Sequence, residues 1–598
     1  MRYGRRKSFF ADIAERFGNA LCREDRFPAS PPSLYTRLGK RFQKSRIGAL
    51  CGDGYDRAGW QFRLRRRGMQ WHEESRLSAL GRRLGAYVLE SSAGYLGLLF
   101  LTLGISFLIL VLIVDALSSD SAQISTSVSL ILLSLPLLGS RRSLGAMLSD
   151  SLLIGKATEL VGKAPCFAFQ RGESGEGRPM AVLAISAVLV TLGGIFSPAS
   201  VVRGLLFFAL LGLLFPVPEV GLPIVLFLFP FLFATAHPTV LLLFLLLILG
   251  SAWLLKIYCG RRDFGLELVD LFVLLFALLL LLGGAIGYGD VRVGATLSFF
   301  TLSYFPVKGL LSSRLWRRRA CAALCAGGSV CAAFGILQYF FGELALAWVD
   351  GARFFDIGGR VCSFFDNPNI LAIYLLFVFP MALCAAMDRG RSVPRRFFFF
   401  IGALCMLLCI VFTWSRGAWL GALLSLALLF LFHSPATAKA LLLGSPFAFC
   451  TLPFVPQSVI RRFLSIGDLT ESSIRYRLYT WQGVLDMIGA HPFGIGVGEA
   501  AFESVYPHYA KSGIETVMHA HQLLLQITLE LGWVGCAVFL LIVAQAFLCG
   551  FGRRRSMGAP YALCGVLVMG CFDHIWYAPA MLVMTVVSLA FSLVEGED

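Results

Sequence analysis

The segment from Ser473 to Gly535 carries the residue types that could do chemistry. It holds arginines, acids, glycines and the sequence His-Ala-His at 519–521, whereas most of the chain around it is apolar. Imidazole exchanges protons near neutral pH, and guanidinium stays positively charged and binds anions. General-base and anion-binding roles are therefore available here. In a largely apolar chain, one long polar loop is the expected location of the functional site.

His521 is the predicted general base. It begins a long apolar helix at a membrane boundary, where a histidine could also lie without a catalytic role. His519, two residues earlier, is expected to help bind substrate. Together with His508 and Glu515 it could instead form a metal site, since imidazole suits zinc. The sequence offers no His-Glu-x-x-His arrangement, so we expect no metal.

Two arginines lie at the predicted ends of apolar helices. Arg416 follows Ser415 at the end of a span, where an arginine can also simply extend to the membrane surface. Arg360 precedes an Asn-Pro-Asn sequence at 367–369 that marks a turn before a helix. A helix N-terminus favours anions, although a plain helix start is an equal alternative.

Arg477 lies at the start of a predicted amphipathic helix in the long loop. Apolar residues recur there at helical spacing and predict one apolar stripe, made of Ile474, Leu478, Trp481, Leu485 and Ile488. Arg477 precedes Trp481 by one turn, close enough for a cation–π contact. The alternative is a solvated arginine on a helix at the membrane surface, which applies equally to Arg475 and Arg462.

Further polar residues lie beyond the His-Ala-His sequence. Gln522, Gln526 and Glu530 share one stripe of the apolar helix. A carboxylate within a span usually faces the bundle interior with a partner, so Glu530 is either structural or part of a cavity. Asp573 and His574 lie between the two final apolar spans and are weaker candidates for the same cavity.

The composition is that of an integral membrane protein. The chain has 598 residues, of which 57% are hydrophobic and 15% charged, and its mean hydropathy is +0.75. Soluble domains contain about 25% charged residues. The net charge of +16 could suggest nucleic acid, but the arginines cluster in short connectors and near the N-terminus. Cytoplasmic loops of membrane proteins have this pattern, so we expect no nucleic-acid partner.

Alternating apolar spans and connectors predict an all-α bundle of about twelve to sixteen membrane-spanning helices. We divide the chain into a basic N-terminal extension at 1–92, membrane helices at 93–341, and a catalytic region at 342–598 with a long loop at 456–520. With the N-terminus in the cytoplasm, the strong basic clusters all fall on the cytoplasmic side. The long loop then faces away from the cytoplasm, without access to ATP or nucleotide sugars.

Apolar runs also predict the bounds of single spans. Spans are expected near 293–311, 368–387 and 521–548, and a shorter one near 203–217; the shorter spans could also be half-helices or merged pairs. The sequence GIGVG at 494–498 has regularly spaced glycines but follows no Rossmann-type strand. We therefore expect a tight turn there and not dinucleotide binding.

Four spaced motifs resemble those of the O-antigen ligase family, which includes the O-antigen polymerase type of enzyme. They are RVCSFFDNPNILA at 360–372, TWSRGAWLGA at 413–422, RLYTWQGVLDMIGAHPFGIGVGEAAF at 477–502 and HQLLLQITLELGWVG at 521–535. The last is similar to the ligase pattern of His, then Asn, Ser or Gln, then nine residues and Gly-x-x-Gly. The part of the chain before residue 342 resembles the family only as a stack of spans.

The resemblance implies an enzyme of the bacterial cytoplasmic membrane. Such enzymes move a glycan from an undecaprenyl-pyrophosphate carrier to an acceptor hydroxyl, on a glycan or a lipid, at the outer face. They use no metal, nucleotide or other cofactor. Besides the carrier-linked donor and the acceptor, the implied partners are membrane lipids. The implied site residues are His521 as general base and, for substrate, Arg416, Arg477, Arg360, His519 and Gln522.

Two alternatives stay open. A polymerase differs from a ligase only in its acceptor, which is a second carrier-linked glycan. The His-Gln-x9-Gly-x-x-Gly match favours a ligase, whereas the N-terminal extension and additional spans depart from the usual ligase length. The other class is a polysaccharide or lipid transporter without catalysis. Transporters often carry internal repeats, and none is visible in this sequence.

Overall fold

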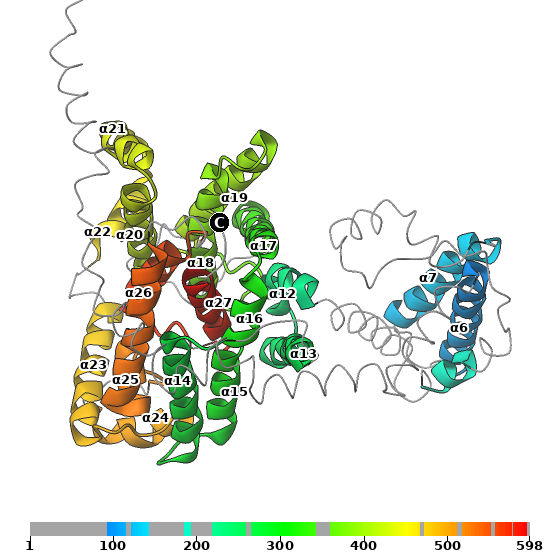
Figure 1. The fold of residues 1–598 in the computed structure, drawn as a ribbon, viewed down its shortest axis with the longest axis horizontal. Helices are drawn as coiled ribbons and strands as arrows, with labels where there is room; N and C mark the ends of the chain where they lie inside the picture. Colours follow the sequence, from blue (N-terminus) through cyan, green and yellow to red (C-terminus); the bar gives the residue numbers. More distant parts are fainter. Residues whose placement is uncertain are drawn as a thin grey trace, which may run out of the picture. The chain divides into compact units, whose positions relative to one another are not determined.

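The structure is a computed structural model that describes residues 92–114, 121–140, 142, 185–192, 218–258, 265–342, 359–466, 472–510, 517–551, 557–576 and 578–594. Every regular element in these ranges is a helix, and no β-strand occurs among them (Figure 1). The predicted all-α class is confirmed. Residues 1–91, which are nearly all of the predicted basic extension, and the expected span at 203–217 lie outside the described residues.

The chain divides into two compact units. The smaller consists of Gly59–Gly221 and Leu254–Asp263, and the larger of Met1–Ala58, Leu222–Trp253 and Phe264–Asp598. In the smaller unit, α6 (Ala93–Val114) and α7 (Ser121–Leu138) pack against each other. Leu103, Phe107 and Leu130 form the buried contact.

Residues 185–192 of the smaller unit are also helical, and the helices that follow them lie wholly or mostly in the larger unit. In chain order they are α12 (Pro218–Leu232), α13 (Pro238–Tyr258), α14 (Leu268–Ala285), α15 (Val291–Leu302), α16 (Tyr304–Leu311), α17 (Arg314–Phe341), α18 (Pro368–Met387), α19 (Val393–Phe412), α20 (Arg416–Phe432), α21 (Pro435–Thr451), α22 (Gln457–Leu464), α23 (Ser472–Ala490), α24 (Glu499–Val505), α25 (Leu523–Gly550), α26 (Ala559–Gly570) and α27 (Met581–Leu593). Two short 3-10 turns, η4 (Leu452–Phe454) and η5 (Tyr506–His508), accompany them.

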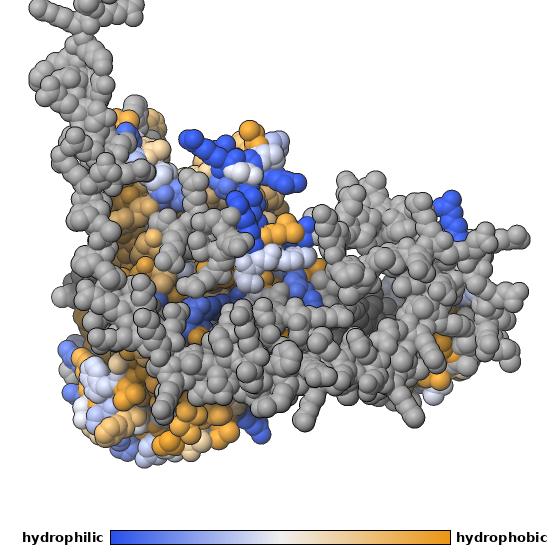
Figure 2. Space-filling view, viewed as in Figure 1, coloured by the Kyte–Doolittle hydropathy of each residue, from blue (hydrophilic) through white to orange (hydrophobic). Residues whose placement is uncertain are grey.

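Six of the described helices are long and apolar enough to cross a membrane, namely α13, α14, α17, α18, α19 and α25. Shorter apolar helices of 10–17 residues accompany them. Figure 2 shows apolar side chains on the surface of the described part, as expected for helices that face lipid. The chain is a multi-pass membrane protein, as predicted. The expected count of twelve to sixteen spans stays a prediction.

Helix α18 forms the centre of the larger unit (Figure 1). It packs against α17, α19, α20, α26 and α27, and nearly all of its residues from Leu371 to Ala386 are buried. A helix that is apolar on every side and covered on every side is a core helix. Its bounds agree with the predicted span at 368–387. The side chains at its two ends are thereby placed at fixed positions.

The predicted span at 293–311 is divided at Ser303 into two helices, α15 and α16. Pro306 lies in the first turn of α16 and has no N–H to donate to the Leu302 carbonyl, so a continuous helix would lose a hydrogen bond here. The Ser303 hydroxyl instead donates to the Phe300 carbonyl at 2.6 Å and caps the end of α15.

Helix α25 is also interrupted, at Gly532, which has φ +70° and ψ −177°. At the interruption, carbonyl groups of the preceding turn of α25 lose their partners within the helix. The glycine turn predicted at 494–498 donates hydrogen bonds to them instead. The Ile495 N–H donates to the Leu529 carbonyl at 2.8 Å. The expected span at 521–548 therefore consists of two helical halves. The 492–498 segment holds them together through backbone hydrogen bonds.

The other edge of the glycine turn binds the connection between α14 and α15. The Tyr288 N–H donates to the Ile495 carbonyl at 3.0 Å, and the Val497 N–H donates to the Gly283 carbonyl at 2.9 Å. Gly496, between them, has φ +109°, a value that L side chains rarely adopt. The glycines thus allow one extended strip of backbone to connect two helical elements.

Helix α23 packs on α24 and the start of α25 through a stripe that agrees with the predicted one at Ile488 but not at Leu485. The buried residues on this face of α23 are Val484, Met487 and Ile488, and they contact Phe502 and other apolar residues of the loop. Leu485, which was expected in the stripe, is 54% exposed. The predicted spacing included Leu485, whereas the packed face runs through positions 480, 484 and 487.

Replacing Gly496 with alanine is expected to lower the free energy of unfolding by about 1–3 kcal/mol. The new Cβ would lie 2.5 Å from the Gly289 backbone nitrogen, at a φ of +109°. Gly489→Ala in α23 is the matched control, because no atom lies within 4 Å of its added Cβ. Helical alanine there should be neutral or slightly stabilising. Thermal unfolding in detergent measures both, and equal midpoints would contradict the assigned role of the turn.

Candidate active site

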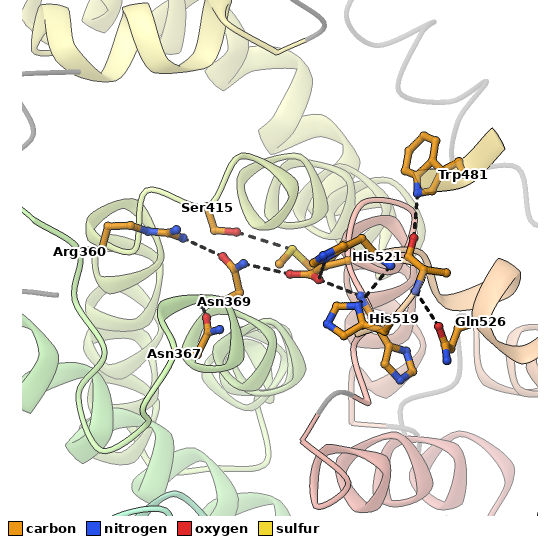
Figure 3. Close-up of polar contacts among 12 residues, drawn as sticks. Arg360, Asn367, Asn369, Ser415, Trp481, His519, His521 and Gln526 are labelled. Carbon is orange, nitrogen blue, oxygen red and sulfur yellow. Dashed lines mark hydrogen bonds and ion pairs between the residues drawn. The ribbon is translucent and has the colours of Figure 1, made fainter. Parts of the chain in front are cut away.

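Several helix ends meet at one place in the larger unit (Figure 3). They are the segment before α18, the α19–α20 turn, the residues before α25 and the α26–α27 turn. Their side chains form a continuous polar series, Arg360–Asn369–Asp573–His521. Asn369 and Asp573 are 204 residues apart in the chain, so tertiary folding alone brings the series together.

Arg360 begins the series and is only 7% exposed. Its Nε donates to the Thr413 carbonyl at 2.7 Å, and its Nη2 donates to Asn369 Oδ1 at 2.7 Å. Asn367 caps α18 by accepting a hydrogen bond from the Asn369 N–H at 2.8 Å, as the predicted turn requires. Burial, followed by the charge of Arg462, lowers the pKa of Arg360 to about 9. The guanidinium is therefore still charged at neutral pH.

Asp573 lies at the centre of the series. Its Oδ2 accepts from Asn369 Nδ2 at 2.9 Å, and its Oδ1 accepts from the His574 N–H at 2.9 Å. Burial would raise the pKa of this carboxyl, but the hydrogen bond from His521 and the charge of Arg477 hold the pKa well below its usual range. Asp573 is thus an ionised carboxylate inside the protein.

His521 completes the series, with Nδ1 at 3.3 Å from Asp573 Oδ1. An ionised carboxylate can only accept hydrogen bonds, so Nδ1 carries the hydrogen in this contact, and Nε2 has a lone pair whenever the ring is neutral. No described residue hydrogen-bonds Nε2, and the side chain is 25% exposed. The Tyr476 ring packs nearby, with ring centroids 6.0 Å apart. This imidazole can accept a proton from a substrate.

Two further histidines pack beside it. Ring centroids are 4.1 Å apart between His519 and His521, and 5.5 Å apart between His519 and His574. Burial, followed by the charge of His521, lowers the pKa of His519 to about 3, and burial lowers the pKa of His574 to about 4. Both rings are neutral near pH 7. His519 can therefore bind substrate through hydrogen bonds but not as a cation.

Arg416 is held by the segment that follows α22. Its Nη1 donates to the Ser465 carbonyl at 3.2 Å and to Ser465 Oγ at 3.0 Å. The same hydroxyl donates to the Arg462 carbonyl at 2.9 Å. Because the charge of Arg462 lowers the pKa of Arg360, this group lies near the start of the polar series. The described contacts do not join Arg416 to His521 directly.

Arg477 is half-buried, and no described residue accepts a hydrogen bond from its guanidinium. Its positive charge lowers the pKa of both Asp573 and His519, so it lies close to the series. The expected cation–π contact with Trp481 is not found among the described residues. The Trp481 indole instead turns toward the loop before α25, where its Nε1 donates to the Ala520 carbonyl at 3.0 Å.

Gln522 is the N-cap of α25, and its side-chain oxygen accepts a hydrogen bond from the Leu525 N–H. A capping side chain fixes the start of the helix and hence the residue before it. The expected role of Gln522 in substrate binding stays a prediction.

The site also contains a set of potential metal ligands. Donor atoms of His519, His521 and Asp573 all lie within 4.8 Å of one another. Two imidazoles and a carboxylate suit zinc. The charge of Arg477, however, acts on both His519 and Asp573 and opposes a second cation between them. The donor types fit a metal, whereas the electrostatic field of the site favours an anion.

The other metal set considered from the sequence is not formed by the described residues. His508 is exposed, and its Nδ1 lies 3.3 Å from the Val505 carbonyl. Glu515 lies outside the described residues.

Residues 401–540 match a family model described as O-Antigen ligase. This part of the chain is an O-antigen ligase domain. The resemblance predicted from the four motifs is thereby confirmed, and the family covers both ligases and polymerases. Arg416, Arg477 and His521 all lie inside the ligase domain. No curated protein matches the chain.

The polar series extends beyond the matched ligase domain. Arg360 and Asp573 lie outside 401–540, yet they bond to Thr413 and His521 within it. The ligase domain therefore depends on α18 and on the α26–α27 turn to complete its site.

The contact between Asp573 and Asn369 was not predicted from the sequence. Asp573 was only a weak candidate for the cavity, and Asn369 was assigned to a turn. The position of Asp573 between two apolar helices was a signal in the sequence. A carboxylate near the membrane is energetically unfavourable unless it has a polar or charged partner. The identity of its partners could not be predicted from spacing.

The protein is expected to lose stability as the pH falls from about 7 toward 4. His519 and His574 have folded-state pKa values below the usual 6.5, so the unfolded chain takes up protons that the folded chain does not. Their stabilising contribution is complete above the unfolded value and is lost as the pH falls. The loss should be on the order of 1–2 kcal/mol per histidine at about pH 5.

Thermal unfolding midpoints of the detergent-solubilised protein, measured from pH 8 to pH 4.5, test this expectation. The His519→Gln variant should show a shallower fall than the wild type over that range. His508→Gln, at an exposed position, is the matched control and should follow the wild-type curve. A His519→Gln curve parallel to the wild-type curve would contradict the assignment.

Proposed function

We propose that the protein transfers a glycan from an undecaprenyl-pyrophosphate-type lipid carrier to an acceptor hydroxyl. The observation that supports this most strongly is the polar series Arg360–Asn369–Asp573–His521, which ends at His521 inside the O-antigen ligase domain that also contains Arg416 and Arg477. The series joins a base to a group of guanidinium charges. A general base and an anion-binding group are the two parts that this transfer requires.

His521 is the general base of the proposed reaction. Its Nε2 accepts the proton of the acceptor hydroxyl as the oxygen attacks the anomeric carbon of the donor sugar. Asp573 Oδ1, 3.3 Å from Nδ1, accepts a hydrogen bond from that nitrogen and so keeps the hydrogen there. Its negative charge then stabilises the imidazolium that forms. As the new bond forms, the bond between the anomeric carbon and the pyrophosphate oxygen breaks, and its electron pair leaves with the pyrophosphate.

The negative charge that develops on the leaving pyrophosphate is bound by guanidinium groups. Arg477 is the preferred ligand, because its guanidinium is not hydrogen-bonded to described residues while its charge reaches Asp573 and His519. Arg416 binds next to it from the start of α20. Arg360 is already bonded to Thr413 and Asn369, so it contributes charge and rigidity. Guanidinium binds phosphate in a planar fork, which lysine cannot reproduce.

The site is proposed to face away from the cytoplasm, in the cytoplasmic membrane of a bacterium. Helix α18 begins at the polar series and ends at Asp388, whose carboxylate pairs with Arg318 at 2.7 Å. This end of the bundle carries the basic clusters at 312–319 and 389–396. Basic clusters favour the cytoplasmic side, and 20 residues of helix span about 30 Å. The donor is already activated, so the reaction is proposed to need neither a nucleotide nor a resident metal.

The acceptor distinguishes a ligase from a polymerase, and both types belong to the family. We favour the ligase because of the His-Gln-x9-Gly-x-x-Gly sequence that begins at His521. Analysis of surface glycans in a deletion strain tests the choice. Loss of glycan attachment supports a ligase, whereas attached single repeats support a polymerase. Flipping of the carrier without transfer by the purified protein would support a transporter instead.

Replacing His521 with alanine is expected to reduce glycan transfer by about 10²–10⁴-fold, because the acceptor hydroxyl loses its base. Asp573→Asn should reduce it about as much, since a neutral amide no longer fixes the hydrogen on Nδ1. Binding of the carrier-linked donor should change little in either variant. Transfer is measured with purified protein and lipid-linked donor in buffer that contains EDTA.

His508→Ala is the control, because this histidine is exposed and lies outside the polar series. Undiminished transfer by His521→Ala would remove the proposed base. Loss of wild-type activity in EDTA, restored by added zinc, would show that the donor set at His519, His521 and Asp573 holds a metal.

Replacing Arg477 with glutamine is expected to weaken binding of the pyrophosphate-linked donor by about 10–100-fold, the value of a charge-assisted hydrogen bond. Arg477→Lys should recover only part of this loss, because the fork geometry is missing. Arg475→Gln is the matched control, since Arg475 is an exposed cation on the same helix. Equilibrium binding of a short prenyl-pyrophosphate glycan gives the comparison. Equal effects at 475 and 477 would indicate a general surface charge rather than a ligand.

A further inference from the structure

The residue before His521 is held from two sides by buried side chains. Ala520 is fully buried; its N–H donates to Gln526 Oε1 at 2.8 Å, and its carbonyl accepts from Trp481 Nε1 at 3.0 Å. Gln526 belongs to α25 and Trp481 to α23, so two helices hold the two peptide groups on either side of Ala520 (Figure 3). The backbone that carries the proposed base is therefore clamped.

The orientation of the Gln526 amide is set by Glu530, one turn further along α25. Gln526 is 2% exposed, and its Nε2 donates to Glu530 Oε1 at 2.9 Å. The same carboxylate oxygen accepts from the Gly498 N–H at 3.3 Å, which ties it to the glycine turn. An amide has one acceptor end and one donor end. An acceptor at position 530 therefore directs the amide oxygen of Gln526 toward the Ala520 N–H.

His521 needs this support because its backbone is strained. Its φ is +48°, in the left-handed region that non-glycine residues rarely adopt. Such a conformation persists only when the surrounding contacts determine it. The hydrogen bonds to Ala520 on one side and the Gln522 cap on the other supply those contacts.

We propose that Gln526 and Glu530 are positioning residues of the transfer reaction. They hold the 519–521 turn so that Nδ1 of His521 meets Asp573 and Nε2 stays free for the acceptor hydroxyl. The proposal rests on the proposed function, in which His521 is the base. It assigns these two polar residues of α25 a role in catalysis in addition to their mutual hydrogen bond.

A purely structural role for the pair predicts a different outcome, and α25 itself offers the control. Gln545 is a second buried glutamine of this helix, 4% exposed, whose Nε2 lies 2.9 Å from Cys549 Sγ. It has no contact with the polar series among the described residues. Gln545→Leu therefore reports the cost of losing a buried amide in α25 without disturbing His521.

The experiment compares Gln526→Leu, Glu530→Leu, Glu530→Gln and Gln545→Leu in transfer kinetics and thermal unfolding. Gln526→Leu and Glu530→Leu should lower kcat about 10–100-fold, because small misplacements of a reacting group have effects of this size. KM for the donor should stay within about 3-fold, since the guanidinium ligands are untouched. Glu530→Gln keeps an oxygen acceptor and should restore kcat to within about 3-fold of the wild type. Gln545→Leu should leave kcat unchanged, and because its Oε1 has no hydrogen-bond partner among the described residues, the unfolding midpoint should change little.

Combination with His521→Ala provides the decisive readout. If Gln526 acts through His521, Gln526→Leu should cause no further loss of kcat in the His521→Ala background. A full additional loss there, or equal kcat values for Gln526→Leu and Gln545→Leu, would overturn the positioning role. Should Gln526→Leu not fold, Trp481→Phe removes the opposite bond to Ala520 and carries the same expectation. Full activity of His521→Ala would overturn the proposed function itself, whereas an inactive His521→Ala with an unchanged Gln526→Leu overturns only this inference.

Discussion

A buried negative charge at Asp573 determines how the rest of the site is arranged. An isolated carboxylate inside a protein is very unfavourable, so it must be surrounded by donors and positive charge. The Asn369 amide, the His574 N–H and the His521 imidazole provide the donors, and Arg360 and Arg477 provide the charge. Each of these contacts also fixes its partner. The carboxylate thus sets the tautomer of the imidazole while keeping a group of guanidinium charges close to it.

The helices supply the rigidity that this arrangement needs. The buried helix α18 places Asn369 at its first turn, and the α19–α20 turn offers the Thr413 carbonyl to Arg360. On the other side, the glycine turn joins the two halves of α25 to the α14–α15 connection. Polar backbone at membrane depth is tolerated where it is buried in protein. The interruption at Gly532 therefore belongs to the support of the site and is not a defect in the span.

The fold class and most helix bounds follow from the sequence, because hydrophobic runs of membrane length are a strong local signal. The motifs also located Arg360, Arg416, Arg477 and His521 near helix ends. Contacts that depend on tertiary packing were not predictable in this way. The indole of Trp481 pairs with the Ala520 carbonyl instead of Arg477, and Leu485 faces outward, because neighbouring elements decide which helical face is covered. The break at Gly532 depends on hydrogen bonds to the 492–498 segment, about forty residues earlier in the chain. No local sequence pattern indicates that these two segments meet.

The contact between Asn369 and Asp573 has a consequence for biosynthesis. The two residues are separated by 204 positions, and the carboxylate belongs to the turn that precedes the final helix, α27. A ribosome must therefore add 204 residues after Asn369 before the carboxylate can reach its amide partner. Until then, the nascent ligase domain contains its arginines and its imidazole in a membrane, with nothing to orient the ring. Insertion of α26 and α27 then completes the polar series from residues that entered the membrane earlier.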